Sequence, residues 1–328
     1  MPLPTTRRQA LALLGATSAS LALPAFAQDT GPYPTRPIRL VIPTPPGGAM
    51  DGTARLIAEK LAAAWKQPVV VDNRPGGNGA VAYSAVAHAA PDGYTVLLSL
   101  SSLVQTALLS KTPPYTLQQL TPVALVAMLP NGFAVGKDVP VATVQEFVDW
   151  AKGQKNGVDY GSSGAGSSGH IMGGTLAKAA GINLVHVGFK GEAPAICPPR
   201  TVWMAAVFGA TGTLVAHAKA GNLKILAVAL PNRLKDYPEV PTFSEAGFPA
   251  VNLSGWSMAA VPAGTSKPIV ERLSTEISRI VQMPEVSARI DSFGFQAQGS
   301  TPEAAQRFLQ EETTRWSAAI KAANVSME

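Results

Sequence analysis

The sequence predicts an α/β protein with two lobes, each built on a central β-sheet that is flanked by helices. Short runs of β-branched and aliphatic residues alternate with segments of helical periodicity, which is typical of parallel sheets. The alternation stops near residue 130 and then restarts. The chain is also 328 residues long, which is too long for one small domain and suits two lobes of ordinary size.

The first part of the chain reads strand, helix, strand, helix, strand. The expected elements are strands over Ile38–Ile42, Val69–Val71 and Tyr94–Leu98, a helix over Thr53–Trp65, and a second helix that ends near Ala89. Because the connections are short, these elements predict parallel strands with right-handed crossovers.

The pattern restarts with an apolar, extended stretch over Val123–Val135. The elements after it are helices over Thr143–Lys152 and His170–Ala180, strands over Val158–Ser162, Leu184–Phe189, Leu223–Leu230 and Leu253–Val261, and final helices over Lys267–Ile280 and Thr301–Ala322. We expect one lobe from residues 28–130 together with 252–328, and the other from residues 131–251. Two crossings of the chain between the lobes would create a hinge and a cleft.

The first 27 residues have the features of an export signal. Arg7 and Arg8 precede an apolar stretch over Ala10–Leu23, and Ala25 and Ala27 form an A-x-A cleavage pattern. The apolar stretch has about 14 residues, whereas a membrane span needs about 20. We therefore predict a cleaved signal peptide over residues 1–27 rather than an anchor. The paired arginines resemble a twin-arginine signal, and Sec export is the alternative.

Composition excludes several classes of protein. Hydrophobic residues make up 46% of the chain, which excludes a disordered protein. The formal charge of +5 falls to +3 without the two arginines of the signal, no run of five basic residues occurs, and aromatic residues make up only 6%. We therefore expect no nucleic-acid partner. Cys197 is the single cysteine, and no Cys/His cluster has zinc-ligand spacing, so we expect no disulfide and no metal.

A glycine-rich loop, Pro45–Asp51, lies between the first predicted strand and the first predicted helix. Open α/β sheets bind ligands at the carboxyl ends of their strands. The N–H groups of Gly47 and Gly48 can converge on an anion there, and the following helix adds the positive end of its dipole. A tight turn is the alternative for this loop, and a helix N-cap is the alternative role for Asp51.

A second loop of this kind, Ser162–His170, lies between a strand and a helix of the other lobe, and it carries four hydroxyl groups. Gly164, Gly166 and Gly169 also spell G-x-G-x-x-G, which alone is weak support for a dinucleotide site. Such a site would need an acidic residue at the end of the next strand, where Lys190 stands. We therefore expect neither NAD nor any other cofactor.

Catalytic patterns are missing from the sequence. No G-x-S-x-G motif of an esterase occurs, and no paired carboxylates share an evident site. His88 and His217 fall on predicted helices and His186 falls in a predicted strand, positions that are typical of structural histidines. His170 lies in the second loop, where it could donate to an anion or cap its helix.

Seven ordered motifs resemble the Bug family of periplasmic solute receptors, which serve tripartite tricarboxylate transporters. The motifs are Tyr33–Pro34, Pro43–Asp51, Asn73–Gly79, Pro91–Tyr94, Tyr160–Gly164, Phe189–Gly191 and Pro241–Gly247. The likeness covers essentially the whole chain after the signal. It implies a type II periplasmic binding protein fold in which a small carboxylated solute is held between two lobes by N–H groups, hydroxyls and waters.

The resemblance also implies a set of ligand-binding residues. These would be Gly47, Gly48, Asp51, Ser101 and Ser102 in the first lobe, and Ser163, Ser167, Ser168, His170, Lys190 and Gly191 in the second. Lys190 would pair with a distal carboxylate or, alternatively, would be a solvated lysine that closes a turn.

One stretch departs from the family pattern. The family continues after Gly191 with an apolar helix, a Gly-Gly turn and an aspartate, whereas this chain has two adjacent prolines, Pro198 and Pro199, which would break a helix. Phe189 also replaces the usual tyrosine. We hypothesise that residues 196–203 reflect a short reading-frame slip in the gene, which resequencing would test. A genuine segment would impair folding or closure of the second lobe.

From these observations we expect an exported receptor, not an enzyme, that captures a small carboxylate by lobe closure and delivers it to the membrane subunits of a tripartite tricarboxylate transporter. We expect a monomer. The alternatives are a periplasmic hydrolase or dehydrogenase on an α/β scaffold, and a ligand sensor that takes no part in transport.

Overall fold

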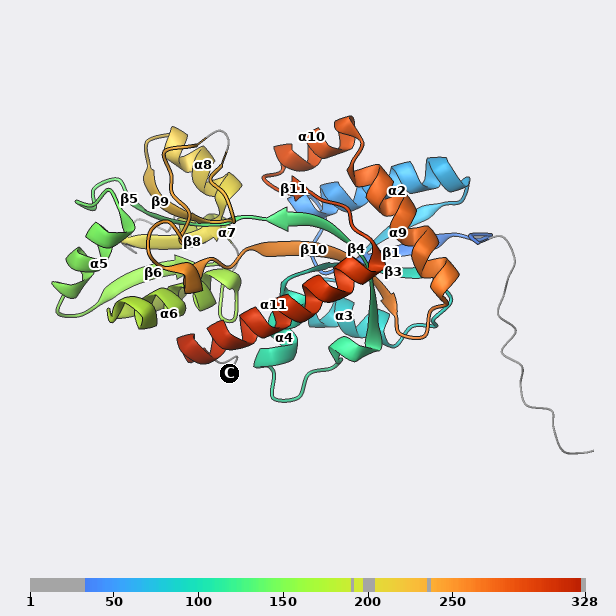
Figure 1. The fold of residues 1–328 in the computed structure, drawn as a ribbon, viewed down its shortest axis with the longest axis horizontal. Helices are drawn as coiled ribbons and strands as arrows, with labels where there is room; N and C mark the ends of the chain where they lie inside the picture. The colour runs from blue at the N-terminus through green and yellow to red at the C-terminus, as the bar shows by residue number, and fades with distance from the viewer. Residues whose placement is uncertain (1–32, 190–191, 197–203, 235–236, 326–328) are drawn as a thin grey trace, which may run out of the picture. The chain divides into compact units, whose positions relative to one another are not determined.

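Two β-sheets organise the computed structural model, which describes residues 33–189, 192–196, 204–234 and 237–325 (Figure 1). The six-stranded sheet has the order β11-β4-β10-β3-β1-β2, and the five-stranded sheet has the order β7-β6-β8-β5-β9. We call these sheets, with the helices that pack on them, the first lobe and the second lobe.

The first lobe has a parallel centre. Its strands are β1 (Ile38–Ile42), β2 (Val69–Asn73), β3 (Thr95–Leu100), β4 (Leu120–Leu129), β10 (Gly255–Pro262) and β11 (Gln296–Ala297). Strand β1 pairs in parallel with β2 and β3, whereas β10 runs antiparallel to both β3 and β4. The helices are α2 (Ala49–Trp65), α3 (Ala80–Ala87), α4 (Ser102–Leu109), α9 (Lys267–Val281), α10 (Pro284–Ser292) and α11 (Pro302–Ala323).

The second lobe repeats this plan with a smaller sheet. Its strands are β5 (Asn131–Gly136), β6 (Val158–Ser162), β7 (Leu184–Gly188), β8 (Ala206–Ala210) and β9 (Leu223–Ala229). Strand β6 pairs in parallel with β7 and β8, and β5 runs antiparallel to β8 and β9. The helices are α5 (Val144–Lys152), α6 (Ser168–Ala180), α7 (Glu192–Ile196) and α8 (Thr211–Lys219).

Most predicted elements lie where the sequence places them, and two differences are informative. Helix α2 begins at Ala49, four residues before the predicted start at Thr53. The apolar stretch Val123–Val135 is not one extended element but two strands, β4 and β5, which belong to different sheets and are separated only by Pro130. Proline has no backbone N–H to donate to a sheet, so it suits the point at which the chain leaves one sheet for the other.

The hypothesis about residues 196–203 falls mostly outside the described residues. Only Ile196, the last residue of α7, belongs to the described part, where it is buried beside Ala195. The reading-frame hypothesis therefore stays a prediction.

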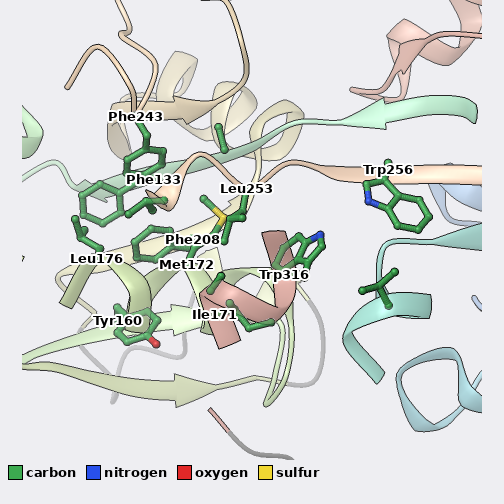
Figure 2. Close-up of a cluster of buried hydrophobic side chains, with 14 of the residues drawn as sticks. Phe133, Tyr160, Ile171, Met172, Leu176, Phe208, Phe243, Leu253, Trp256 and Trp316 are labelled. Carbon is green, nitrogen blue, oxygen red and sulfur yellow. The ribbon is translucent and has the colours of Figure 1, made fainter. Parts of the chain in front are cut away.

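One cluster of buried side chains includes members from both sheets. In the second lobe Phe133 stacks on Phe208 with ring centroids 4.6 Å apart, and Phe208 stacks on Phe243 (Figure 2). Trp256 of β10 and Trp316 of α11 belong to the same cluster and are completely buried. Aromatic side chains of this size supply a large share of the apolar area that a core buries.

Helix α11 is tied to the first lobe by a buried carboxylate. The indole N–H groups of Trp256 and Trp316 both donate to Oε2 of Glu312, each at 3.0 Å, and Arg315 pairs with Oε1. Burial raises the pKa of Glu312, and the charged arginine opposes this. Because α11 contacts α6 as well as β4, this helix links the two lobes.

Candidate anion site

Two loops with the same local plan occupy corresponding places in the two lobes. The first, Pro43–Gly48, connects β1 to α2, and the second, Ser163–Ser167, connects β6 to α6. Each follows a strand that has parallel neighbours on both sides, and each leads directly into a helix. Carboxyl ends of parallel strands and N-termini of helices are the places where α/β folds bind anions.

The carboxylate of Asp51 holds the first loop in place. It is 4% exposed and accepts hydrogen bonds from the backbone N–H of Gly47 at 3.0 Å, from Asn73 Nδ2 at 2.9 Å and from Arg55 Nε at 2.9 Å. The hydrogen bond from Arg55 is the largest of the influences that lower the pKa of Asp51 to about 2. The carboxylate is therefore charged and fully engaged at neutral pH.

This geometry excludes one of the two roles considered for Asp51, that of the helix N-cap. The N-cap of α2 is Gly48, and Asp51 is the third residue of the helix, so the N-cap alternative is wrong. The side chain instead bonds backward to the loop. Because the N–H of Gly47 donates to this carboxylate, it is not free to donate to an anion as the sequence predicts.

The first loop leaves open space at its two glycines. A Cβ atom built on Gly47 or Gly48 would have no heavy atom within 4 Å. Gly47 has φ +92°, a conformation that disfavours any other residue, whereas Gly48 has ordinary extended torsion angles. The protein would therefore accept a side chain at Gly48, and the space there is available to a ligand.

The second loop is organised around the hydroxyl of Ser162, which is completely buried at the end of β6. Its Oγ accepts from the N–H of Gly164 and from the hydroxyl of Ser167, and it lies 2.7 Å from Nε2 of His186. Ser167 caps helix α6 by accepting from the N–H of His170. The hydrogen of the Ser167 hydroxyl is thus used within the loop.

Two histidines stack on each other and contact this loop and the end of β6. The imidazole rings of His170 and His186 lie 3.7 Å apart and are nearly parallel, and Nδ1 of His170 accepts from the N–H of Gly166 at 3.1 Å. Burial lowers the pKa of both rings, and the adjacent His170 helps to lower the pKa of His186 to about 4. Both rings are neutral at pH 7. His170 does not cap its helix, and its Nδ1 is an acceptor, so only Nε2 can carry the hydrogen of the neutral ring.

The remaining predicted residues of the first lobe lie at the start of α4. Ser101 is the N-cap residue of this helix, and Ser102 lies 2.6 Å from the hydroxyl of Tyr83. Gln105, one turn further along α4, was not predicted. Its Nε2 lies 3.5 Å from Ser101 Oγ and donates to Ser168 Oγ at 2.9 Å. This hydrogen bond joins a helix of the first lobe to a helix of the second.

Ser163 is exposed in the second loop, and Ser168 is the first residue of α6. Lys190 and Gly191 lie outside the described residues, so their predicted contacts stay predictions. Among the described residues no group of three His, Cys, Asp or Glu side chains could hold a metal ion. No helix in the described part of the chain is both long enough and apolar enough to span a membrane.

A cavity of 1520 Å³ lies elsewhere, among α8, α11 and the segments around β11. Thr211, Gly294 and Phe308 are among its lining residues, and it is lined by none of the predicted ligand-binding residues that the structure describes. The loops identified from the sequence and this cavity are therefore separate features of the molecule.

The chain is similar to one family of receptors and to several solved structures of periplasmic binding proteins. Residues 53–325 match the profile of a family described as "Tripartite tricarboxylate transporter family receptor". Protein BugT of Bordetella pertussis is 31% identical over 316 residues, which cover 95% of this chain and 96% of BugT.

Two solved structures from Rhodopseudomonas palustris superpose on most of the chain. Rpa4515, solved with adipate, has a TM-score of 0.79 and 30% identity, and the match covers 90% of this chain and 99% of Rpa4515. MatC (Rpa3494), solved with bound malate, has a TM-score of 0.74 and 28% identity, and the match covers 88% of this chain and 100% of MatC.

Proposed function

We propose that this chain, which belongs to the tripartite tricarboxylate transporter receptor family, captures a small carboxylate between its two loops and delivers it to the membrane subunits of such a transporter. Its family membership confirms the predicted resemblance to Bug receptors and the two-lobed periplasmic binding fold. The chain is accordingly a solute-binding receptor and not an enzyme.

One observation carries the proposed site. The hydrogen bond from Gln105 to Ser168 brings the N-terminal turns of α4 and α6 together, one from each lobe. The hydroxyls of Ser101 and Ser168 therefore flank the same amide, at the ends of two helices whose dipoles favour an anion. We take residues 28–130 with 252–328 as one lobe of this receptor and residues 131–251 as the other.

The ligand that we propose is a small dicarboxylate. Adipate and malate, which accompany two solved relatives, both carry two carboxylate groups on a short chain. Two loops, one on each lobe, match a ligand with a negative group at each end. A helix N-terminus alone contributes at most about 2 kcal/mol to an anion, whereas micromolar binding needs about 8 kcal/mol. Both loops, their hydroxyls and exclusion of water must therefore act together.

In this proposal Asp51 and His170 hold the two loops in place through their hydrogen bonds to loop N–H groups. Asp51 fixes the first loop with its carboxylate, while Gly48, Ser101 and Ser168 contact the ligand. His170 donates its Nε2–H to the bound carboxylate, because its Nδ1 already accepts from the N–H of Gly166. The protein acts in the periplasm after removal of residues 1–27, by either Tat or Sec export, and it acts as a monomer.

Calorimetric titration with malate, adipate and a monocarboxylate such as butyrate tests this function. We expect micromolar binding of at least one dicarboxylate and weaker binding of the monocarboxylate. Well-folded protein that binds none of them would contradict the proposal. Uptake of the same dicarboxylate should be lost from cells that lack the receptor, and unchanged uptake would favour the sensor alternative.

A further inference from the structure

We propose that Gln105 is a positioning residue that holds the two lobes in register and orients the hydroxyls of Ser101 and Ser168 as hydrogen-bond donors to the bound carboxylate. This inference rests on the proposed function, and nothing in the sequence motifs points to Gln105. It is carried by the side chain's burial, its bond across the lobes and the chemistry of a hydroxyl group.

Gln105 of α4 makes a buried side-chain hydrogen bond to the second lobe. Gln105 is only 1% exposed, and its side-chain amide nitrogen donates to Ser168 Oγ at 2.9 Å. A buried polar group of this kind keeps its partner because leaving it unpaired costs free energy. The bond therefore favours the arrangement of lobes in which Ser168 faces α4.

The direction of this hydrogen bond determines what Ser168 can do next. A serine hydroxyl has one hydrogen to donate and two lone pairs that accept. Because the amide N–H of Gln105 fills one lone pair of Ser168, the hydroxyl hydrogen is left to donate elsewhere. The second amide hydrogen points to Ser101 in the same way, over a longer distance of 3.5 Å.

Ser167 provides the contrast within the same loop. Its hydroxyl donates to Ser162 Oγ at 3.1 Å, so its hydrogen is already used inside the second lobe. An anion such as a carboxylate requires donors. The hydroxyl of Ser168 is therefore available to donate to a ligand, and the hydroxyl of Ser167 is not.

A double-mutant cycle tests this role. In Gln105→Met the side chain keeps its length and loses both donors, and we expect malate or adipate to bind about 3- to 10-fold more weakly. Gln105→Glu replaces the donors by a charged acceptor that competes for the serine hydrogens and repels the ligand, so we expect a loss of more than about 100-fold. In a Ser168→Ala background, Gln105→Met should weaken binding by less than about 2-fold further, because the partner through which it acts is gone.

The matched control is Gln145→Met. Gln145 is an exposed helical glutamine on α5 that also donates to a side chain, Asp149. This variant should bind the dicarboxylate as tightly as the wild-type protein. Equal losses from Gln105→Met in the wild-type and Ser168→Ala backgrounds would overturn the positioning role, and so would full affinity in Gln105→Met.

Small-angle X-ray scattering without ligand separates this inference from the proposed function. We expect a larger radius of gyration for Gln105→Met than for the wild-type protein or Gln145→Met, because the lobes lose one of the contacts that join them, although α11 still contacts both. An unchanged radius would overturn the inference whether or not a carboxylate binds. If the wild-type protein binds neither malate nor adipate, the proposed function fails, and the scattering result still decides the role of Gln105 in holding the lobes.

Discussion

The loops of the two lobes share a backbone plan and differ in what holds them. The first loop is held by a charged group, the Asp51 carboxylate, which bonds Gly47, Asn73 and Arg55. The second loop is held by neutral groups, the Ser162 hydroxyl and the imidazoles of His170 and His186 beneath it.

The two lobes also differ in the space around the glycines at the helix starts that these loops lead into. A Cβ atom on Gly48 would meet nothing within 4 Å, whereas a Cβ atom on Gly169 would lie 2.8 Å from the carbonyl oxygen of Phe208. The first loop has open space at Gly48, and the start of α6 is packed against its own sheet. One strand–loop–helix plan is thus stabilised in two ways, by a charged group in the first lobe and by neutral groups in the second, and the two should respond differently to substitution and to pH.

Filling the open space should have the largest effect on binding. We expect Gly48→Val to weaken dicarboxylate binding by more than about 100-fold, which is about 2.7 kcal/mol, because the side chain occupies the ligand's place. Calorimetry measures the affinity, and thermal unfolding should show nearly wild-type stability. In contrast, Gly169→Val should lower the melting temperature strongly, since its Cβ meets backbone. Wild-type affinity in Gly48→Val would place the ligand elsewhere.

Removing the central hydroxyl of the second loop should have the largest effect on stability. Ser162→Ala leaves the Gly164 N–H, the Ser167 hydroxyl and His186 without their shared partner. We expect the free energy of unfolding to fall by about 2–3 kcal/mol, because buried polar groups lose their hydrogen bonds. Urea denaturation measures the change. Ser163→Ala, at an exposed position of the same loop, should change it by less than about 0.5 kcal/mol.

Replacing the Asp51 carboxylate, which holds the first loop, should lower the free energy of unfolding by a smaller amount. We expect Asp51→Asn to lower the free energy of unfolding by about 1–2 kcal/mol at pH 7, since an amide replaces the charged acceptor of Arg55. The pKa of Asp51 is lowered from 3.8 to about 2, so its contribution is complete above about pH 4 and is lost as the pH falls toward 2. The difference in the free energy of unfolding between the wild-type protein and Asp51→Asn should therefore become smaller as the pH falls from about 4 to 2. A gap that stays constant from pH 7 to pH 2 would contradict the account.

The smallest effect concerns acid sensitivity of the second loop. Because burial lowers the pKa of His186 from 6.5 to about 4, the unfolded chain binds more protons than the folded protein between these values. Wild-type stability should therefore fall as the pH is lowered from about 6.5 to 4, and because the His186 ring is only half-buried and screened by solvent, its contribution should be on the order of 1 kcal/mol. We expect His186→Gln to show a shallower decline in urea denaturation over this range. Parallel pH profiles of the two proteins would contradict the prediction.

Local chemistry made much of the fold predictable. The run Ile38–Ile42 is apolar, β-branched and followed by Pro43, and its predicted bounds match β1. Periodicity could not show that Val123–Val135 divides between two sheets, because both strands are buried and equally apolar. Sheet membership depends on which strands lie alongside, and that is a property of the tertiary structure.

The sequence could predict which loops form the candidate site, but not which side chains contact each other there. Glycines next to a helix start indicate an anion site, whatever the rest of the chain does. The stack of His170 on His186 and the bond of Gln105 to Ser168 join residues that are 16 and 63 positions apart. No spacing rule links such pairs, and the sequence placed His186 among structural histidines, a role that its buried stack is consistent with.

A crystal structure of the protein with its tightest-binding dicarboxylate would show whether the two loops hold the ligand between them. We predict one carboxylate at the first loop near Gly48, and the other within hydrogen-bond distance of the Ser168 hydroxyl. A dicarboxylate bound instead in the 1520 Å³ cavity beside Thr211 would contradict the account.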